Sequence, residues 1–139
     1  MVAAVVIDNS GLLPLFIPDE SAAIMQRALA LADHNGTYLL SPNLCLIEFG
    51  NGIVTCVRRK RITAEGAVFA YRRLPELPIE FVDNETAQNL PVIHDLAMRH
   101  SLSFYDALYL ALAIEKNALL ATQDKALHQA AEREGIAFA

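Results

Sequence analysis

Short apolar runs alternate along this chain with longer stretches of mixed polarity. A continuous run of mostly β-branched residues, bounded by turn residues, is typical of a strand buried on both faces of a parallel sheet. Residues 2–7 form such a run. Short strands are also predicted for residues 37–40, 79–82 and 118–121, and a last one for residues 136–138.

The longer stretches carry apolar residues three or four positions apart, which predicts amphipathic helices. They cover approximately residues 11–17, 18–35, 41–59, 63–73, 84–99, 103–117 and 124–134. Pro42 is expected at the first position of the third helix, and Pro91 as a kink or restart in the fifth. Asn35-Gly36 and Gly135 are expected to end helices.

This alternation predicts a three-layer α/β fold, with a central, mainly parallel sheet of about five short strands flanked by helices. The 139 residues are 54% hydrophobic and 19% charged, which excludes a disordered chain and suits a full core. There is no internal repeat and no linker-like segment, so residues 1–139 are expected to form one domain.

Charge and cysteine content narrow the picture further. The net charge of −5 gives no support for general nucleic-acid binding, although local patches matter more than the total. Cys45 and Cys56 lack metal-ligand spacing and are expected to be reduced packing residues. The longest apolar run, residues 107–114, is too short to span a bilayer, so a soluble cytoplasmic protein without a membrane segment is expected.

The most apolar helix, within residues 102–113, carries a single acid, Asp106, in its first turn. Ser103 lies three positions earlier, so Asp106 could simply complete a capping box and favour the helix dipole. The alternative, a functional carboxylate, depends on whether other acids reach the same place.

Connectivity predicts that they do, because ligands of parallel α/β sheets bind beyond the carboxyl ends of the strands. Asp8 follows the first strand, Asp124 follows the fourth by two residues, and Glu48 lies early in the helix that leaves the second. A helix that feeds a parallel strand runs antiparallel to it, which places Asp106 at the same edge. For Asp8 an Asx turn, for Asp124 a helix N-cap and for Glu48 a solvated position remain alternatives.

Four carboxylates in one cleft would repel one another and raise one another's pKa unless a cation neutralised them. The cation that suits oxygen ligands is a hard divalent ion, Mg²⁺ or Mn²⁺, and such a site suits phosphodiester hydrolysis. A basic run, Arg58-Arg59-Lys60-Arg61, together with Arg72 and Arg73, could guide an RNA backbone. A solvated helix end is the alternative for this run.

The chain resembles the PIN-domain family, and within it the VapC-type toxin ribonucleases of type II toxin–antitoxin systems. The most distinctive match is Ser-Phe-Tyr-Asp-Ala-Leu-Tyr-Leu-Ala-Leu-Ala, from Ser103 to Ala113. The resemblance covers essentially the whole chain, through Val6-Ile7-Asp8-Asn9-Ser10, Pro42 to Asn51, residues 96–99 and 102–113, Leu119 to Leu127, and Gly135.

The resemblance implies an endoribonuclease that depends on Mg²⁺ or Mn²⁺ and leaves 5′-phosphate and 3′-hydroxyl ends. Its catalytic acids carry over as Asp8, Glu48, Asp106 and Asp124, with Asp8, Asp106 and Asp124 as metal ligands. Ser10 and Thr122 match the supporting hydroxyl positions, whereas Asn9 replaces the usual small residue and could alter access beside the metal. An RNA substrate, a homodimer and a small antitoxin partner are also implied.

Two other classes of function are considered. One is a catalytically silent PIN-fold binding module that acts through dimer or antitoxin surfaces; retention of all four acids favours the nuclease over it. The other is a receiver-like signalling domain, which would need paired N-terminal acids and a lysine after the last strands. Asp8-Asn9 and the mid-chain Glu48 fit that layout poorly.

Overall fold

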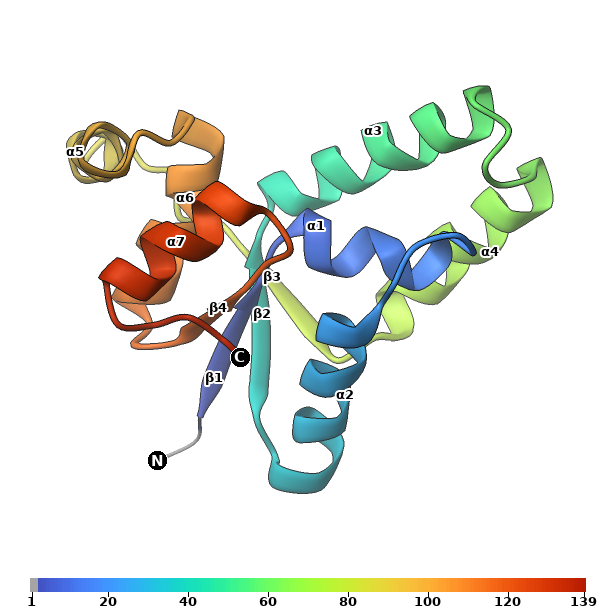
Figure 1. The fold of residues 1–139 in the computed structure, drawn as a ribbon, viewed down its shortest axis with the longest axis horizontal. Coiled ribbons are helices and arrows are strands. Elements are labelled where there is room, and N and C mark those ends of the chain that lie inside the picture. Colours follow the sequence, from blue (N-terminus) through green and yellow to red (C-terminus); the bar gives the residue numbers. More distant parts are fainter. Residues whose placement is uncertain (1–2) are drawn as a thin grey trace.

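The computed structural model describes residues 3–139 and contains a four-stranded, entirely parallel sheet in the order β3-β2-β1-β4 (Figure 1). The strands are β1 (Ala4–Ile7), β2 (Tyr38–Pro42), β3 (Ile79–Val82) and β4 (Leu119–Ala121). Val6, in the middle of the sheet, pairs with Leu40 on one side and Leu120 on the other. The predicted α/β class is confirmed, while Val2 of the predicted first strand lies outside the described residues.

Helices cover both faces of this sheet. Figure 1 shows α5, α6 and α7 on one side and α1 and α2 on the other. The helices are α1 (Asn9–Leu12), α2 (Ala23–Asn35), α3 (Leu44–Arg58), α4 (Ala64–Arg73), α5 (Leu90–His100), α6 (Phe104–Glu115) and α7 (Lys125–Arg133). Two short 3-10 helices, η1 (Leu13–Phe16) and η2 (Leu74–Glu76), follow α1 and α4.

Three predicted details are wrong. Residues 136–138 do not form a strand: Ala137 makes one isolated bridge to Leu120. Pro42 ends β2 instead of starting α3, because the backbone N–H of Asn43 still donates to the Val82 carbonyl at 2.9 Å and extends the strand pairing. Pro91 lies in the first turn of α5, where its missing N–H leaves no helical bond unmade, so it neither kinks nor restarts the helix.

The buried centre of the molecule is built on β1 and α6. Val5, Val6 and Ile7 are almost completely buried, and α6 packs across β1 and β2 with nearly every side chain from Ala107 to Ala113 in the core. Cys45 and Cys56 are buried and free, as predicted. Over the described part of the chain, no helix has both the length and the apolar character needed to cross a membrane.

The carboxyl ends of the strands lie together at one edge of the sheet, at the top of Figure 1. Helices α1, α3, α6 and α7 all begin at this edge. The ends of β1 and β4 are joined there, since the backbone N–H of Asp8 donates to the Ala121 carbonyl at 3.2 Å. Residues at the starts of four helices are therefore brought close together.

Candidate active site

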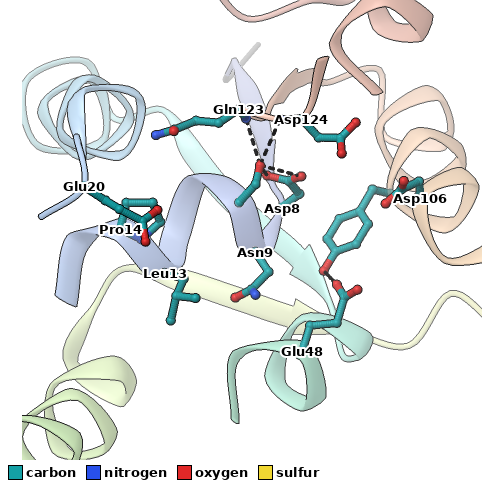
Figure 2. A pocket seen from close by; sticks show the side chains of 11 residues that line it. Asp8, Asn9, Leu13, Pro14, Glu20, Glu48, Asp106, Gln123 and Asp124 are labelled. Atoms are coloured by element: carbon teal, nitrogen blue, oxygen red, sulfur yellow. Dashed lines mark hydrogen bonds between the residues drawn. The ribbon is translucent and has the colours of Figure 1, made fainter. Parts of the chain in front are cut away.

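A pocket of about 410 Å³ opens at this edge, and all four predicted acids line it (Figure 2). The four acids thus lie at one edge of the sheet, as connectivity predicted. The lining residues are Asp8, Asn9, Ser10, Leu13, Pro14, Glu20, Glu48, Asp106, Tyr109, Gln123 and Asp124. Among the residues of the described range that line it, five are acids and none is a lysine, arginine or histidine. The pocket is therefore strongly anionic.

Asp8 is the most deeply placed of these acids, with only 4% of its surface exposed. Its Oδ1 accepts the backbone N–H of Gly11 at 3.0 Å and the hydroxyl of Ser10 at 2.8 Å. Its Oδ2 accepts the hydroxyl of Thr122 at 2.6 Å. The bond from Gly11 makes Asp8 the N-cap of α1, a local backbone role of the kind that the Asx-turn alternative proposed, and the three bonds together hold the carboxylate in one orientation. Three donors leave part of the acceptor capacity of a carboxylate unused.

Ser10 and Thr122, the two predicted supporting residues, fasten the end of β1 to the segment after β4. The Ser10 hydroxyl donates to Asp8 and accepts the backbone N–H of Gln123 at 2.8 Å. The Thr122 hydroxyl donates to Asp8 and accepts the backbone N–H of Asp124 at 3.0 Å. Asp8 and Asp124 are thereby positioned by the same pair of hydroxyls.

Asp106 lies in the first turn of α6, and Ser103 caps this helix by accepting the Asp106 backbone N–H at 3.1 Å. The cap is supplied by the serine, so the predicted capping arrangement exists without requiring the Asp106 carboxylate. Burial raises the pKa of Asp106, and the charge of Asp124 raises it further. An uncompensated carboxylate is thus held where its charge is unfavourable.

Asp124 combines a structural role with a place in the pocket wall. Its Oδ1 accepts the backbone N–H of Leu127 at 2.9 Å, so it is the N-cap of α7, as the structural alternative expected. Figure 2 shows the same side chain at the pocket, on the side of Asp106. Capping and metal binding are compatible for a carboxylate, because its second oxygen stays available.

Glu48 reaches the pocket from the second turn of α3 and accepts a hydrogen bond from the hydroxyl of Tyr109 (Figure 2). Tyr109 is a core residue, with only 1% of its surface exposed. Burial raises the pKa of Glu48, the Tyr109 bond opposes this, and the charge of Asp106 raises it again. The missed signal was spacing: Tyr109 lies three residues after Asp106 and hence on the same helix face.

Glu20 is a fifth acid in the pocket wall, arriving from the loop between η1 and α2. The guanidinium of Arg61 pairs with this carboxylate and with Asp19, whose Oδ1 lies 2.8 Å away. Arg61 is therefore not free to guide RNA as predicted. Arg58, Arg59 and Lys60 are exposed, but they lie at and just beyond the end of α3. Arg58 is about 15 Å from Glu48 along the helix axis.

The donor set suits a hard divalent cation, since carboxylate oxygens dominate and no cationic side chain within residues 3–139 lines the pocket. In this conformation, however, no three His, Cys, Asp or Glu side chains of residues 3–139 are close enough to form a ready-made ligand set. The carboxylates stand around the wall rather than on a common point. Binding an ion would require the Glu48, Asp106 or Asp124 side chains to turn inward.

The buried Asp8 predicts an unusual pH dependence of stability. Burial raises its pKa to about 6, against the hydrogen bonds from Thr122, Ser10 and Gly11, and the charge of Asp106 adds to the rise. Because the folded state then holds a proton that the unfolded chain releases near pH 4, stability is greater at low pH and falls as pH rises from about 4 to 6. Denaturant unfolding in EDTA should therefore show a loss on the order of 2 kcal/mol between pH 4.5 and 7.

Added Mn²⁺ should reduce that slope, because a bound cation stabilises the ionised carboxylate. Unfolding free energies that stay constant or rise between pH 5 and 7 in EDTA would contradict a raised pKa of Asp8.

Known proteins share sequence similarity with most of this chain. The family model of the PIN domain matches residues 5–133. Ribonuclease VapC3 of Pyrobaculum aerophilum is 28% identical over 122 residues, covering 88% of this chain and 90% of that protein. Ribonuclease VapC1 of Mycobacterium tuberculosis is 29% identical over 123 residues, covering 88% of this chain and 86% of that protein.

Solved structures share the fold at lower identity. PAE2754 from Pyrobaculum aerophilum superimposes with a TM-score of 0.68 at 22% identity, covering 92% of this chain and 79% of that one. The sarcin–ricin-loop-cleaving toxin VapC20 of Mycobacterium tuberculosis superimposes with a TM-score of 0.63 at 19% identity, covering 91% of this chain and 94% of that one. FitAcB from Neisseria gonorrhoeae superimposes with a TM-score of 0.62 at 16% identity, covering 92% of this chain and 93% of that one.

Proposed function

The chain belongs to the PIN-domain family, and on that premise we propose that it is a divalent-metal-dependent endoribonuclease of the VapC type. The single observation that carries the proposal is the anionic pocket, in which acids from four separate elements meet without a cationic lining residue in the described range. Such an arrangement is costly for the empty protein and favourable once a cation is bound.

Asp8, Asp106 and Asp124 would hold Mg²⁺ or Mn²⁺, and Glu48 would complete the catalytic acids. The bound ion would supply Lewis-acid polarisation of the phosphate and a more acidic water. Asp8 is kept in one orientation by Gly11, Ser10 and Thr122, so it needs little reorganisation. Glu48 is directed by the Tyr109 hydroxyl and, with its raised pKa, is suited to accept a proton from the attacking water.

A homodimer and a small antitoxin partner are part of this proposal, on the strength of the family resemblance. Helix α4 leaves Val68, Phe69 and Tyr71 exposed, and α3 leaves Ile47 exposed, which gives apolar surface for such contacts. The silent binding module stays as the second candidate. The observation that favours it is the lack, over residues 3–139, of three acids close enough for a ready-made metal site.

Metal removal separates the two. Purified protein stripped with EDTA is expected to leave end-labelled RNA intact, and Mg²⁺ or Mn²⁺ added in excess should restore cleavage to 5′-phosphate and 3′-hydroxyl products. Cleavage that persists in EDTA, or that leaves cyclic phosphates, would contradict metal-dependent hydrolysis. Folded protein that binds Mn²⁺ in calorimetry yet cleaves no RNA in a pool of structured and unstructured transcripts would favour the binding module.

A further inference from the structure

An anionic pocket poses a problem for an RNA substrate. Each phosphate that flanks the cleaved bond carries a negative charge, and affinity for a nucleic-acid backbone comes chiefly from lysine and arginine contacts. The pocket wall offers five acids and, in the described range, no basic side chain. The basic run at the end of α3 is distant, and Arg61 is paired with Asp19 and Glu20. The cations that hold RNA must therefore lie elsewhere.

A second hollow, of about 630 Å³, lies between the end of α5 and one face of α7. We call it the α5/α7 groove; its polar lining consists of Arg99, His100, Ser101, Gln129, Arg133 and Glu134. The residues from α7 recur at helical spacing, so they line one face of that helix.

Both walls of the α5/α7 groove are connected along the chain to residues of the acid pocket. Helix α7 is capped by Asp124, so Gln129 and Arg133 lie about 8 and 14 Å from that acid along the helix axis. Ser101 directly precedes the short link to Ser103, the cap of the helix that carries Asp106. A strand of RNA that leaves the pocket between Asp106 and Asp124 would enter this groove next.

The charges of the groove are arranged in favour of an anion. Glu134 is its one acid, and it is already engaged by Nε2 of His100 at 2.7 Å and by Arg99 at 3.3 Å. Arg133 is exposed and forms no ion pair with any residue of the described chain. The lining thus carries a positive charge that its own carboxylate does not cancel, in a chain whose net charge is −5.

His100 makes the wall rigid. It is 7% exposed, and its Nδ1 is buried with no partner among the described residues. The hydrogen bond between Nε2 of this buried ring and Glu134 holds that carboxylate in place, and the guanidinium of Arg99 donates to the same carboxylate oxygen.

We propose that the α5/α7 groove binds the phosphate backbone of single-stranded RNA on one side of the cleaved bond. Arg133 is the main phosphate contact, and Arg99 is the second, because it is exposed and shares the single carboxylate of Glu134 with His100, whereas Arg61 is held by two carboxylates of its own. This inference rests on the proposed ribonuclease function and adds the direction in which the substrate leaves the active site. Gln129 and Ser101 provide further hydrogen-bond donors along the same path.

The test is fluorescence anisotropy of labelled single-stranded RNA with wild type, Arg133→Ala and Arg99→Ala, in Ca²⁺ to slow cleavage, over a series of salt concentrations. Each variant is expected to bind about threefold or more weakly at 0.1 M salt and to lower the slope of log affinity against log salt by about 0.7. Lys116→Ala removes the same charge at the far end of α6 and is the matched control. Arg59→Ala tests the rival basic run.

Losses confined to the two groove variants would support the proposal. A loss for Arg59→Ala at least as large as theirs, or groove variants that behave like Lys116→Ala, would overturn it. Poly-glutamate binding that depends on Arg133 while RNA binding does not would assign the groove to an acidic protein segment and also overturn it. Wild-type cleavage of RNA is scored in parallel: if it is intact, only the groove fails, and if wild type neither binds nor cleaves, the ribonuclease function fails with it.

Discussion

Asp106→Asn is expected to remove measurable Mn²⁺ binding and to reduce RNA cleavage by roughly a hundredfold or more, beyond the 10- to 100-fold typical of a lost supporting group. The carboxylate lies partly buried in the pocket with Asp124 and Glu48, where only a cation makes its charge favourable. Asparagine keeps the size of the side chain and leaves the helix cap intact, because Ser103 accepts the backbone N–H of residue 106. Calorimetric Mn²⁺ titration and cleavage assays on the same preparations measure both effects.

Stability gives this prediction a distinct signature. Since burial and Asp124 raise the pKa of Asp106, its ionised form destabilises the metal-free fold, and Asp106→Asn should melt at the same temperature as wild type or higher in EDTA. Wild type should gain stability on adding Mn²⁺, and the variant should gain little. Asp95→Asn, the same change on an exposed position of α5, is the matched control. If Asp106→Asn bound Mn²⁺ as tightly as wild type does, Asp106 would not be a metal ligand and would only have a structural role in the first turn of α6.

The meeting of these acids could be predicted because it depends on connectivity more than on packing. Asp8 and Asp124 follow adjacent parallel strands and so lie at the same edge of the sheet. The helix that carries Asp106 feeds one of these strands, so it must begin at that edge too. The structural alternatives could be predicted for the same reason: the first turn of a helix needs a cap, and Asp8 and Asp124 both supply one. Asp8 and Asp124 each cap a helix and also line the pocket, so the structural and the functional interpretation of these residues are compatible.

Other parts depended on contacts between distant segments and carried no local signal. Glu20 reaches the pocket from a loop whose position is fixed in part by Arg61, 41 residues away. Arg99 and Arg133 lie in helices that meet only through tertiary packing, so the sequence suggested the more conspicuous basic run instead. Residues 136–138 looked like a strand by composition, but only Ala137 pairs with β4. Composition predicts that a segment tends to form a strand, whereas the number of residues that pair depends on how the segment lies along the edge strand β4.

Tyr109→Phe is expected to weaken Mn²⁺ binding and RNA cleavage by about 10- to 100-fold, although Tyr109 would contact neither ion nor substrate. The hydroxyl is the donor that directs Glu48 into the pocket against the charge of Asp106. Phenylalanine fills the same space in the core, where the ring is 1% exposed, so the fold should persist with a loss of about 1–3 kcal/mol. Mn²⁺ calorimetry, cleavage rates and denaturant unfolding measure the three quantities.

A positioning role and a merely structural one differ in how Tyr109→Phe combines with Glu48→Gln. If the hydroxyl acts only through Glu48, the change should add little to the activity lost in Glu48→Gln, because two substitutions in one interacting pair are not additive. A purely structural defect would multiply the two losses instead, and would overturn the positioning role. Tyr105→Phe, four residues earlier on the same helix and 62% exposed, removes the same hydroxyl outside the pocket and should leave Mn²⁺ affinity unchanged. Helix α6 would then contribute to the site twice, through Asp106 at its start and through the buried phenol that holds the opposite wall in place.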